Sequence, residues 1–152
     1  GLKYDEKMGP VIAKYGVPCC LMHNRENSDY RMLIPDICAD LEESLAIAED
    51  AGIDPDQIIL DPGIGFGKTY EQNLAVIHHL EELNRFDLPI LLGTSRKSVI
   101  GLTLDLPAEE RMEGTLVTTV LAVEKGCSFV RVHDVRENVR AIRMARAILE
   151  AE

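Results

Sequence analysis

The sequence has little positive charge, no long apolar run and no paired-cysteine motif. Its 16 lysines and arginines against 26 aspartates and glutamates give a formal charge of −10, which argues against nucleic acid or an anionic membrane surface as a partner. No apolar run approaches the length of a membrane span, and no secretory signal peptide is visible. What remains is one domain's worth of chain, or a piece of a larger domain, with 46% apolar residues for a core.

The cysteines show no metal-binding pattern. Cys19, Cys20, Cys38 and Cys127 form no C-x-x-C motif, and no histidine lies at ligand spacing from them. We predict that they are small, buried, reduced side chains, as is typical of a reducing compartment. The expectation is therefore a cytoplasmic protein whose own side chains hold no metal.

Apolar runs alternate with amphipathic segments along the whole chain. Continuous apolar runs predict buried strands at residues 17–22, 58–60, 88–93 and 129–132. Helical spacing predicts helices at residues 4–15, 35–51, 69–83, 107–125 and from 134 onward. A leading helix followed by four strand–helix units predicts an α/β fold with a parallel sheet covered by helices.

Several details of these helices can be predicted as well. Thr69 and Gln72 have the spacing of a capping box, and Asp134 and Glu137 have the same spacing at the last helix. The side chains expected to face the core are Leu74, Ile77, Leu80, Leu116, Val120, Val123, Val139, Ile142 and Leu149.

The stretch 58–69 carries the strongest local signal. An apolar strand ends in Asp61, and the loop Pro62-Gly-Ile-Gly-Phe-Gly-Lys68 follows it. A carboxylate at the end of a buried strand is costly unless something binds it, and glycine lets the backbone approach a ligand. The loop is neither a P-loop, because Pro62 replaces its first glycine, nor a dinucleotide fingerprint, because its third glycine comes one residue early. It is predicted to be another kind of glycine-rich ligand loop, and a ligand-free tight turn is the alternative.

Polar groups lie at the ends of all four predicted strands. They include Met22-His-Asn-Arg25, Asp61, Thr94-Ser-Arg-Lys-Ser98, Arg131 and His133. In parallel α/β folds the carboxyl edge of the strands is where ligands bind. Cationic groups gathered there on an acidic protein predict a small anionic substrate, and Asp61 is suited to accept paired N–H donors from a heterocycle.

Structural explanations exist for the same residues. Arg131 is a possible ion-pair partner of Asp61 or Asp134, and a lone histidine such as His133 is more often structural than catalytic. Lys97 can be a solvated lysine at a helix start. The placement of all these groups on four strand ends favours the functional interpretation.

Three segments together resemble dihydropteroate synthase, the folate-pathway family inhibited by sulfonamides. They are Asp61-Pro-Gly-Ile-Gly-Phe-Gly-Lys68, Gly93-Thr-Ser-Arg-Lys-Ser98 and Arg131-Val-His-Asp134. The resemblance implies an eight-stranded (β/α)8 barrel, of which this chain would be the C-terminal half: a leading helix and strands five to eight, over residues 1–152. The N-terminal half, which in the family supplies the asparagine linked to magnesium, would lie outside it.

The resemblance also implies roles for single residues in joining 6-hydroxymethyl-7,8-dihydropterin diphosphate to 4-aminobenzoate. On the pterin side, Asp61 would pair with the ring N–H groups, Lys97 would hydrogen-bond the ring, and Met22 and Gly93 would line the pocket. The catalytic group would be Lys97, Arg131 and His133, with Arg131 and His133 holding the diphosphate. On the 4-aminobenzoate side, Ser98 would receive the carboxylate and Phe66 would pack on the ring.

Other functions remain open from the sequence. A non-catalytic pterin- or diphosphate-binding module and a pterin-dependent methyltransferase are the alternatives, although a methyltransferase needs no carboxylate site such as Ser95-Arg-Lys-Ser98. A half barrel would also expose two unpaired strand edges. The sequence therefore predicts that the chain forms a homo-oligomer. Its expected partners are otherwise the small-molecule substrates, pterin diphosphate and 4-aminobenzoate.

Overall fold

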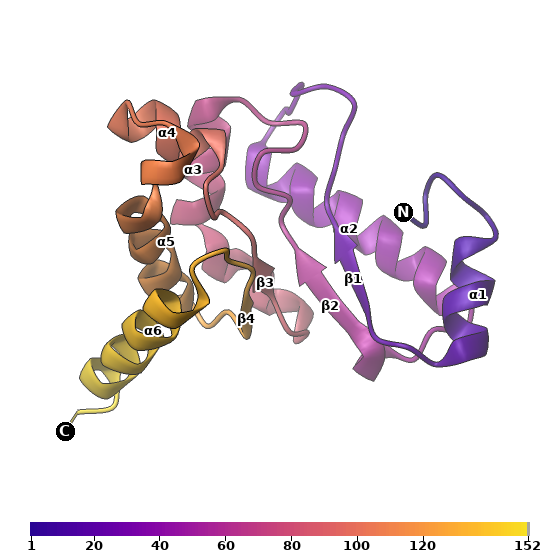
Figure 1. Cartoon of the computed structure of the whole chain (residues 1–152). Helices are drawn as coiled ribbons and strands as arrows, with labels where there is room; N and C mark the ends of the chain where they lie inside the picture. The colour runs from indigo at the N-terminus through magenta and orange to yellow at the C-terminus, as the bar shows by residue number, and fades with distance from the viewer. Residues whose placement is uncertain (152) are drawn as a thin grey trace.

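The computed structural model describes residues 1–151 and contains parallel strands with helices outside them (Figure 1). The strands are β1 (Cys19–Met22), β2 (Ile58–Asp61), β3 (Leu91–Leu92) and β4 (Phe129–Val130). The α-helices are α1 (Met8–Tyr15), α2 (Leu33–Asp50), α3 (Tyr70–His78), α4 (Ser98–Leu104), α5 (Met112–Glu124) and α6 (Val135–Leu149). Short 3-10 helices occupy Pro55–Gln57, Leu80–Phe86 and Ala108–Glu110.

The strands form two parallel pairs joined by one bridge. β1 pairs with β2 so that Met22 lies opposite Asp61, and β3 pairs with β4. Leu60 bridges Ile90, and its N–H donates to the Pro89 carbonyl at 2.9 Å, which places β3 beside β2. The spatial order is therefore β1-β2-β3-β4, and all four strands end at the same edge. The predicted α/β fold is confirmed, although β3 and β4 are only two residues long each.

The core fills the space between the strands and their helices. Its fully buried side chains include Ile37, Leu41, Leu60, Ile64, Leu80, Leu83, Ile90 and Leu92. Burying one such side chain contributes about 1.5–3 kcal/mol. These residues come from α2, from β2 and the loop after it, from the segment after α3, and from β3 and the residue before it. They therefore hold the ends of β2 and β3 relative to each other.

Helices α5 and α6 differ from the prediction. They lie side by side, at the opposite end of the molecule from α1 (Figure 1). The buried residues of α5 are Thr115, Thr118, Thr119 and Ala122, whereas Val120 is exposed. In α6 the buried residues are Asn138 and Ala145, whereas Val139 and Leu149 are exposed. The expected apolar stripes were therefore wrong at Val120, Val139 and Leu149, whereas Leu116, Val123 and Ile142 are half-buried. The fully buried contact between the two helices is instead a hydrogen bond between polar side chains, Thr119 and Asn138.

The two predicted capping boxes have different outcomes. At α3 the box is present: the Thr69 hydroxyl accepts the Gln72 N–H at 3.3 Å, and the Gln72 side chain accepts the Thr69 N–H at 2.9 Å. At α6 the Asp134 side chain makes no cap hydrogen bond. Its carboxylate instead pairs with Arg96 at 2.9 Å, so a distant partner replaces the local one.

The cysteines are free, but they are not all buried. Cys38 is buried, Cys19 and Cys127 are half-buried, and Cys20 is exposed. In β1 only Leu21 is buried, whereas its neighbours Cys20 and Met22 are exposed. Successive side chains of a strand point to opposite faces, so α2 covers one face of β1 and leaves the other open. No helix within residues 1–151 combines the length and apolar character needed to span a membrane.

Candidate functional site

Asp61 lies at the centre of the polar groups that follow the strands. It ends β2 and is only 9% exposed, and its Oδ1 accepts the Gly63 N–H at 2.7 Å. Burial raises the pKa of Asp61, while the Gly63 hydrogen bond and the charges of Lys97, Lys68 and Arg131 act in the opposite direction. A carboxylate from β2 is thus surrounded by cations from three other segments, and no protein group within residues 1–151 donates a hydrogen bond to its Oδ2.

Lys97 reaches from the loop after β3 toward the glycine-rich loop. Its Nζ donates to the Ile64 carbonyl at 2.5 Å and lies 4.9 Å from the centre of the Phe66 ring. Burial lowers the pKa of Lys97, and the nearby Asp61 carboxylate raises it. Lys97 and Phe66, which the sequence placed on separate segments, are therefore neighbours, and Phe66 remains exposed.

Arg131 and His133 follow β4 and are both exposed. Arg131 lies against Gly93, where an added Cβ would be 3.9 Å from the Cβ of Arg131. Within residues 1–151 Arg131 makes no ion pair: its charge acts on Asp61 without a direct contact, and Asp134 pairs with Arg96 instead. The structural explanation for Arg131 is thus not supported, and its guanidinium is available to a ligand.

His133 is held by a residue that the sequence interpretation did not single out. The Ser95 hydroxyl accepts the His133 backbone N–H at 3.2 Å and lies 2.9 Å from the ring Nδ1. A hydroxyl can accept one hydrogen bond and donate another, so this pairing favours a ring proton on Nε2. Ser95 is buried, whereas Ser98, the first residue of α4, is exposed. The sequence signals for Ser95 were its position immediately after a strand and its place in the segment Gly93-Thr-Ser-Arg-Lys-Ser98, and neither assigned it a role of its own.

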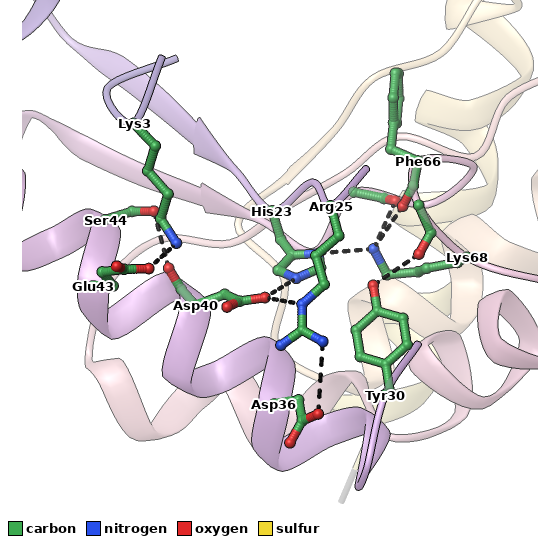
Figure 2. Close-up of polar contacts among 12 residues, drawn as sticks. Lys3, His23, Arg25, Tyr30, Asp36, Asp40, Glu43, Ser44, Phe66 and Lys68 are labelled. Carbon is green, nitrogen blue, oxygen red and sulfur yellow. Dashed lines mark hydrogen bonds and ion pairs between the residues drawn. The ribbon is translucent and has the colours of Figure 1, made fainter. Parts of the chain in front are cut away.

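Figure 2 shows a second polar cluster beneath the glycine-rich loop, built around His23. The ring Nε2 of His23 lies 2.9 Å from Asp40 Oδ2, which also accepts from Arg25 Nε at 2.5 Å. The ring Nδ1 lies 2.9 Å from Lys68 Nζ. Lys68 also donates to the carbonyls of Gly63 and Phe66, at 3.1 Å each. The ammonium group of Lys68 is therefore used inside the loop.

Burial and neighbouring charge determine the protonation state of His23. His23 is 3% exposed, and burial together with the nearby Lys68 charge lowers its pKa to about 4. Burial likewise lowers the pKa of Lys68 to about 8. At neutral pH His23 is thus uncharged: its Nδ1 accepts from Lys68, and its Nε2–H donates to Asp40.

Two of the three loop glycines serve close packing of the backbone. A Cβ on Gly63 would lie 1.9 Å from the His23 carbonyl oxygen, and a Cβ on Gly67 would lie 2.5 Å from that of Arg25. Both residues have positive φ, of 72° and 56°. The expected close approach is real, but at these two positions the neighbour is the segment after β1. The side chain of Met22, opposite Asp61, remains exposed.

The pterin-binding enzyme family provides a sequence match over residues 1–133. This chain belongs to that family. The family relationship confirms the resemblance drawn from the three motifs. The dihydropteroate synthase of Clostridium beijerinckii is 59% identical over 150 residues, which cover 98% of this chain and 56% of the relative. That of Bacillus subtilis is 53% identical, covering 98% and 52%.

Solved structures of the family agree with this fold. The dihydropteroate synthase of Clostridium difficile, determined in the presence of pteroic acid, matches with a TM-score of 0.96 at 45% identity, covering 99% of this chain and 58% of that one. The Yersinia pestis enzyme, in a sulfonamide drug complex, matches with a TM-score of 0.91 at 36% identity, covering 95% and 55%. The chain therefore spans about half the length of the relatives that it matches.

The residues around Asp61 do not fit a magnesium ion. Within residues 1–151, no group of three or more His, Cys, Asp or Glu side chains is arranged to hold a metal. Magnesium prefers carboxylate, phosphate and water oxygens, whereas the nearest charged groups around Asp61 are the cations Lys97, Lys68 and Arg131.

Proposed function

We propose that this chain is the C-terminal half of a dihydropteroate synthase. Its leading helix and four strand–helix units would be strands five to eight of a (β/α)8 barrel, in one domain over residues 1–152. The relatives at 59% and 53% identity, each matched over about half its length, support this assignment. The observation that carries it is the buried Asp61 at the end of β2, under the charges of Lys97, which follows β3, and Arg131, which follows β4.

The pterin would bind against Asp61. One oxygen of this carboxylate already accepts the Gly63 N–H, and Oδ2 would accept an N–H from the heterocycle. Lys97 would hydrogen-bond the same ring from the loop after β3, and Met22 and Gly93 would line the walls of the pocket. The contact between Asp61 and the pterin would be the strongest of the proposed contacts, because hydrogen bonds to charged groups contribute about 1.5–3 kcal/mol.

The chemistry would take place on the side of Arg131. The amine nitrogen of 4-aminobenzoate attacks the pterin methylene carbon, the bond from that carbon to the diphosphate oxygen breaks, and diphosphate leaves with the electron pair. The amine then loses a proton to solvent. Arg131 and His133 would hold the departing diphosphate, and such fixed positive charge can be the largest catalytic contribution. Ser98 would receive the 4-aminobenzoate carboxylate, and the exposed Phe66 ring would pack on its ring.

Magnesium would be supplied from outside this chain. The resemblance assigns its ligand to the N-terminal half, and the cationic surroundings of Asp61 agree with that division. The same division suggests that the isolated chain is inactive. The protein would act in the cytoplasm on small molecules, with neither nucleic acid nor a membrane as a partner.

The proposal is tested by substituting Asp61. Pterin affinity and diphosphate release are measured for the full product of the gene and for the 152-residue chain. Asp61→Asn is expected to weaken pterin binding about 10- to 150-fold, the equivalent of one charged hydrogen bond. Asp56→Asn is the control, because Asp56 is exposed and its side chain accepts no hydrogen bond within residues 1–151.

Two outcomes would change the assignment. Unchanged pterin affinity in Asp61→Asn would contradict the role of Asp61. Pterin binding without diphosphate release from the full gene product, with both substrates and magnesium present, would favour a non-catalytic binding module.

Self-association is the expected quaternary behaviour. The outer edge of β1 pairs with no strand within residues 1–151, and Cys20 and Met22 on its open face are exposed. Unpaired edges are templates for pairing with another chain. We expect the 152-residue chain to form homo-oligomers at micromolar concentration. Light scattering that finds only monomer would contradict this expectation.

A further inference from the structure

We propose that Arg111 is a positioning residue, which fixes the backbone conformation of the loop that carries Lys97 and Ser98. The effect of Arg111 on catalysis rests on the proposed function. Arg111 directly precedes α5 and is half-buried behind the loop. Its NH1 donates to the Arg96 carbonyl at 2.9 Å and to the Lys97 carbonyl at 3.3 Å, and its Nε donates to the Leu106 carbonyl at 2.9 Å. One side chain thus ties both ends of the segment 96–106.

The guanidinium of Arg111 packs against Gly101, in space that a side chain at position 101 would fill. A Cβ on Gly101 would lie 2.2 Å from Arg111 Cζ and NH2 and 2.5 Å from Nε. Gly101 lies within α4, where glycine is intrinsically unfavourable compared with alanine. A glycine in that position is explained by the guanidinium that packs on it.

The loop also has a backbone conformation that needs support. Arg96 has φ of 60°, in the left-handed region that residues other than glycine rarely adopt. Its backbone is held on both sides: the N–H lies 3.4 Å from Oγ1 of Thr115 in α5, and the carbonyl accepts from Arg111, the residue before α5. Such conformations persist only where the surrounding structure holds them. Here the left-handed turn is followed directly by Lys97, which reaches the Ile64 carbonyl.

Arginine is suited to this task and lysine is only partly suited. The guanidinium is planar and always charged, and presents its N–H groups as a fixed fork, whereas lysine offers a single flexible ammonium group. A lysine at position 111 has a single nitrogen, whereas Arg111 reaches the Leu106 carbonyl with Nε and the carbonyls of residues 96 and 97 with NH1. A lysine therefore cannot reproduce this two-nitrogen arrangement. The conservative variant is therefore expected to recover part of the function, which a purely space-filling role does not predict.

The test compares four variants in the full gene product: Arg111→Ala, Arg111→Lys, Gly101→Ala and the double variant Gly101→Ala/Arg111→Ala. A misplacement of about 1 Å can cost about 100-fold in rate. We expect Arg111→Ala and Gly101→Ala each to lower kcat about 10- to 100-fold. KM for the pterin diphosphate should change by a smaller factor, because the stronger pterin contact, Asp61, lies on another strand. Arg111→Lys should recover part of kcat. Arg143→Ala, on the exposed part of α6, is the control.

The double variant separates positioning from general stability. If Gly101→Ala acts by displacing the guanidinium, it should change kcat less than about twofold once Arg111 is already alanine. An additive loss would overturn the proposal, as would kcat within twofold of the unmodified protein in both Arg111→Ala and Gly101→Ala. If Arg111→Ala does not fold, Gly101→Ala and Arg111→Lys still decide the matter.

A readout that needs no activity distinguishes this inference from the proposed function. Hydrogen–deuterium exchange should become faster at residues 95–98 in Arg111→Ala and Gly101→Ala, with residues 61–68 unchanged. If this pattern appears in a protein that makes no pteroate, the positioning role stands and the proposed function fails. If exchange at 95–98 is unchanged, Arg111 does not set the loop.

Discussion

The two strand pairs hold their loops by different chemistry. Behind the β1–β2 pair, the loops are tied together by groups that titrate, with His23 between Asp40 and Lys68. Behind the β3–β4 pair, the buried contacts are neutral: Thr94 to Thr118 at 2.6 Å, and Thr119 to the Asn138 side chain at 2.6 Å. The difference indicates that the buried supports of the first pair respond to pH, whereas the buried Thr94–Thr118 and Thr119–Asn138 contacts behind the second pair are neutral and do not.

The largest expected effect on stability concerns the glycine-rich loop of the β1–β2 half, which packs on the segment after β1. Gly67 and Gly16 have the same φ of 56°, but an added Cβ would lie 2.5 Å from the Arg25 carbonyl oxygen at Gly67 and meets no atom within 4 Å at Gly16. We expect Gly16→Ala to cost about 1–2 kcal/mol, from the left-handed backbone alone. Gly67→Ala should cost about 2–5 kcal/mol, because overpacking is added. Urea unfolding of both variants measures this difference, and equal losses would show that the loop does not depend on the segment after β1.

Acid should weaken the β1–β2 half. The pKa of His23 falls from 6.5 to about 4 on folding, so the folded state binds fewer protons between these values. Its neutral form therefore stabilises the fold fully above pH 6.5, and this contribution of about 3 kcal/mol is lost as pH falls toward 4. The lowered pKa of Asp40 adds a loss in the same direction at lower pH.

The measurement is the free energy of unfolding at pH 7 and pH 4.5, for the unmodified chain and for His23→Gln. The glutamine amide can still donate to Asp40, but it does not titrate. The unmodified chain should lose more stability than the variant over this interval. Equal losses would mean that His23 is not the pH-sensitive support.

The smallest expected effect concerns the β3–β4 half. Thr119→Val removes the hydroxyl that donates to Asn138 Oδ1, and leaves this fully buried acceptor without a partner. An unpaired buried acceptor costs about 1–3 kcal/mol. The loss should be the same at pH 5 and pH 7, because neither group titrates. Thr119→Ser keeps the hydroxyl and is the control. If the loss of stability in Thr119→Val differs between pH 5 and pH 7, the two halves do not differ in the way described.

Local signals in the sequence predicted the parts of the structure that depend on local physics. The alternation of apolar runs and amphipathic segments indicated the α/β fold, and the Thr69–Gln72 spacing indicated the cap of α3, which is present. The end of an apolar run at Asp61 marked the strand end where the cations converge. The predictions of single site residues remain proposals, because their roles depend on bound substrates.

The predictions that failed concern contacts between distant segments. Val120 and Val139 were expected to face the core, but both are exposed, and a fully buried hydrogen bond between α5 and α6 joins Thr119 to Asn138. Asp134 was expected to cap its own helix, but it pairs with Arg96, 38 residues away in the chain. A polar side chain is stable in the interior only when a partner meets it there, and helical periodicity contains no information about that partner.

The sequence alone determined the order of strands and helices, the glycine-rich loop and the set of polar groups at the strand ends, because these follow from side-chain periodicity and local backbone preferences. Only the tertiary structure decided that His23 is buried between Asp40 and Lys68, and that Arg111 packs over Gly101 to hold the Lys97 loop. The physical reason is that burial and charge pairing depend on which distant segments meet, and that meeting is a property of the whole fold.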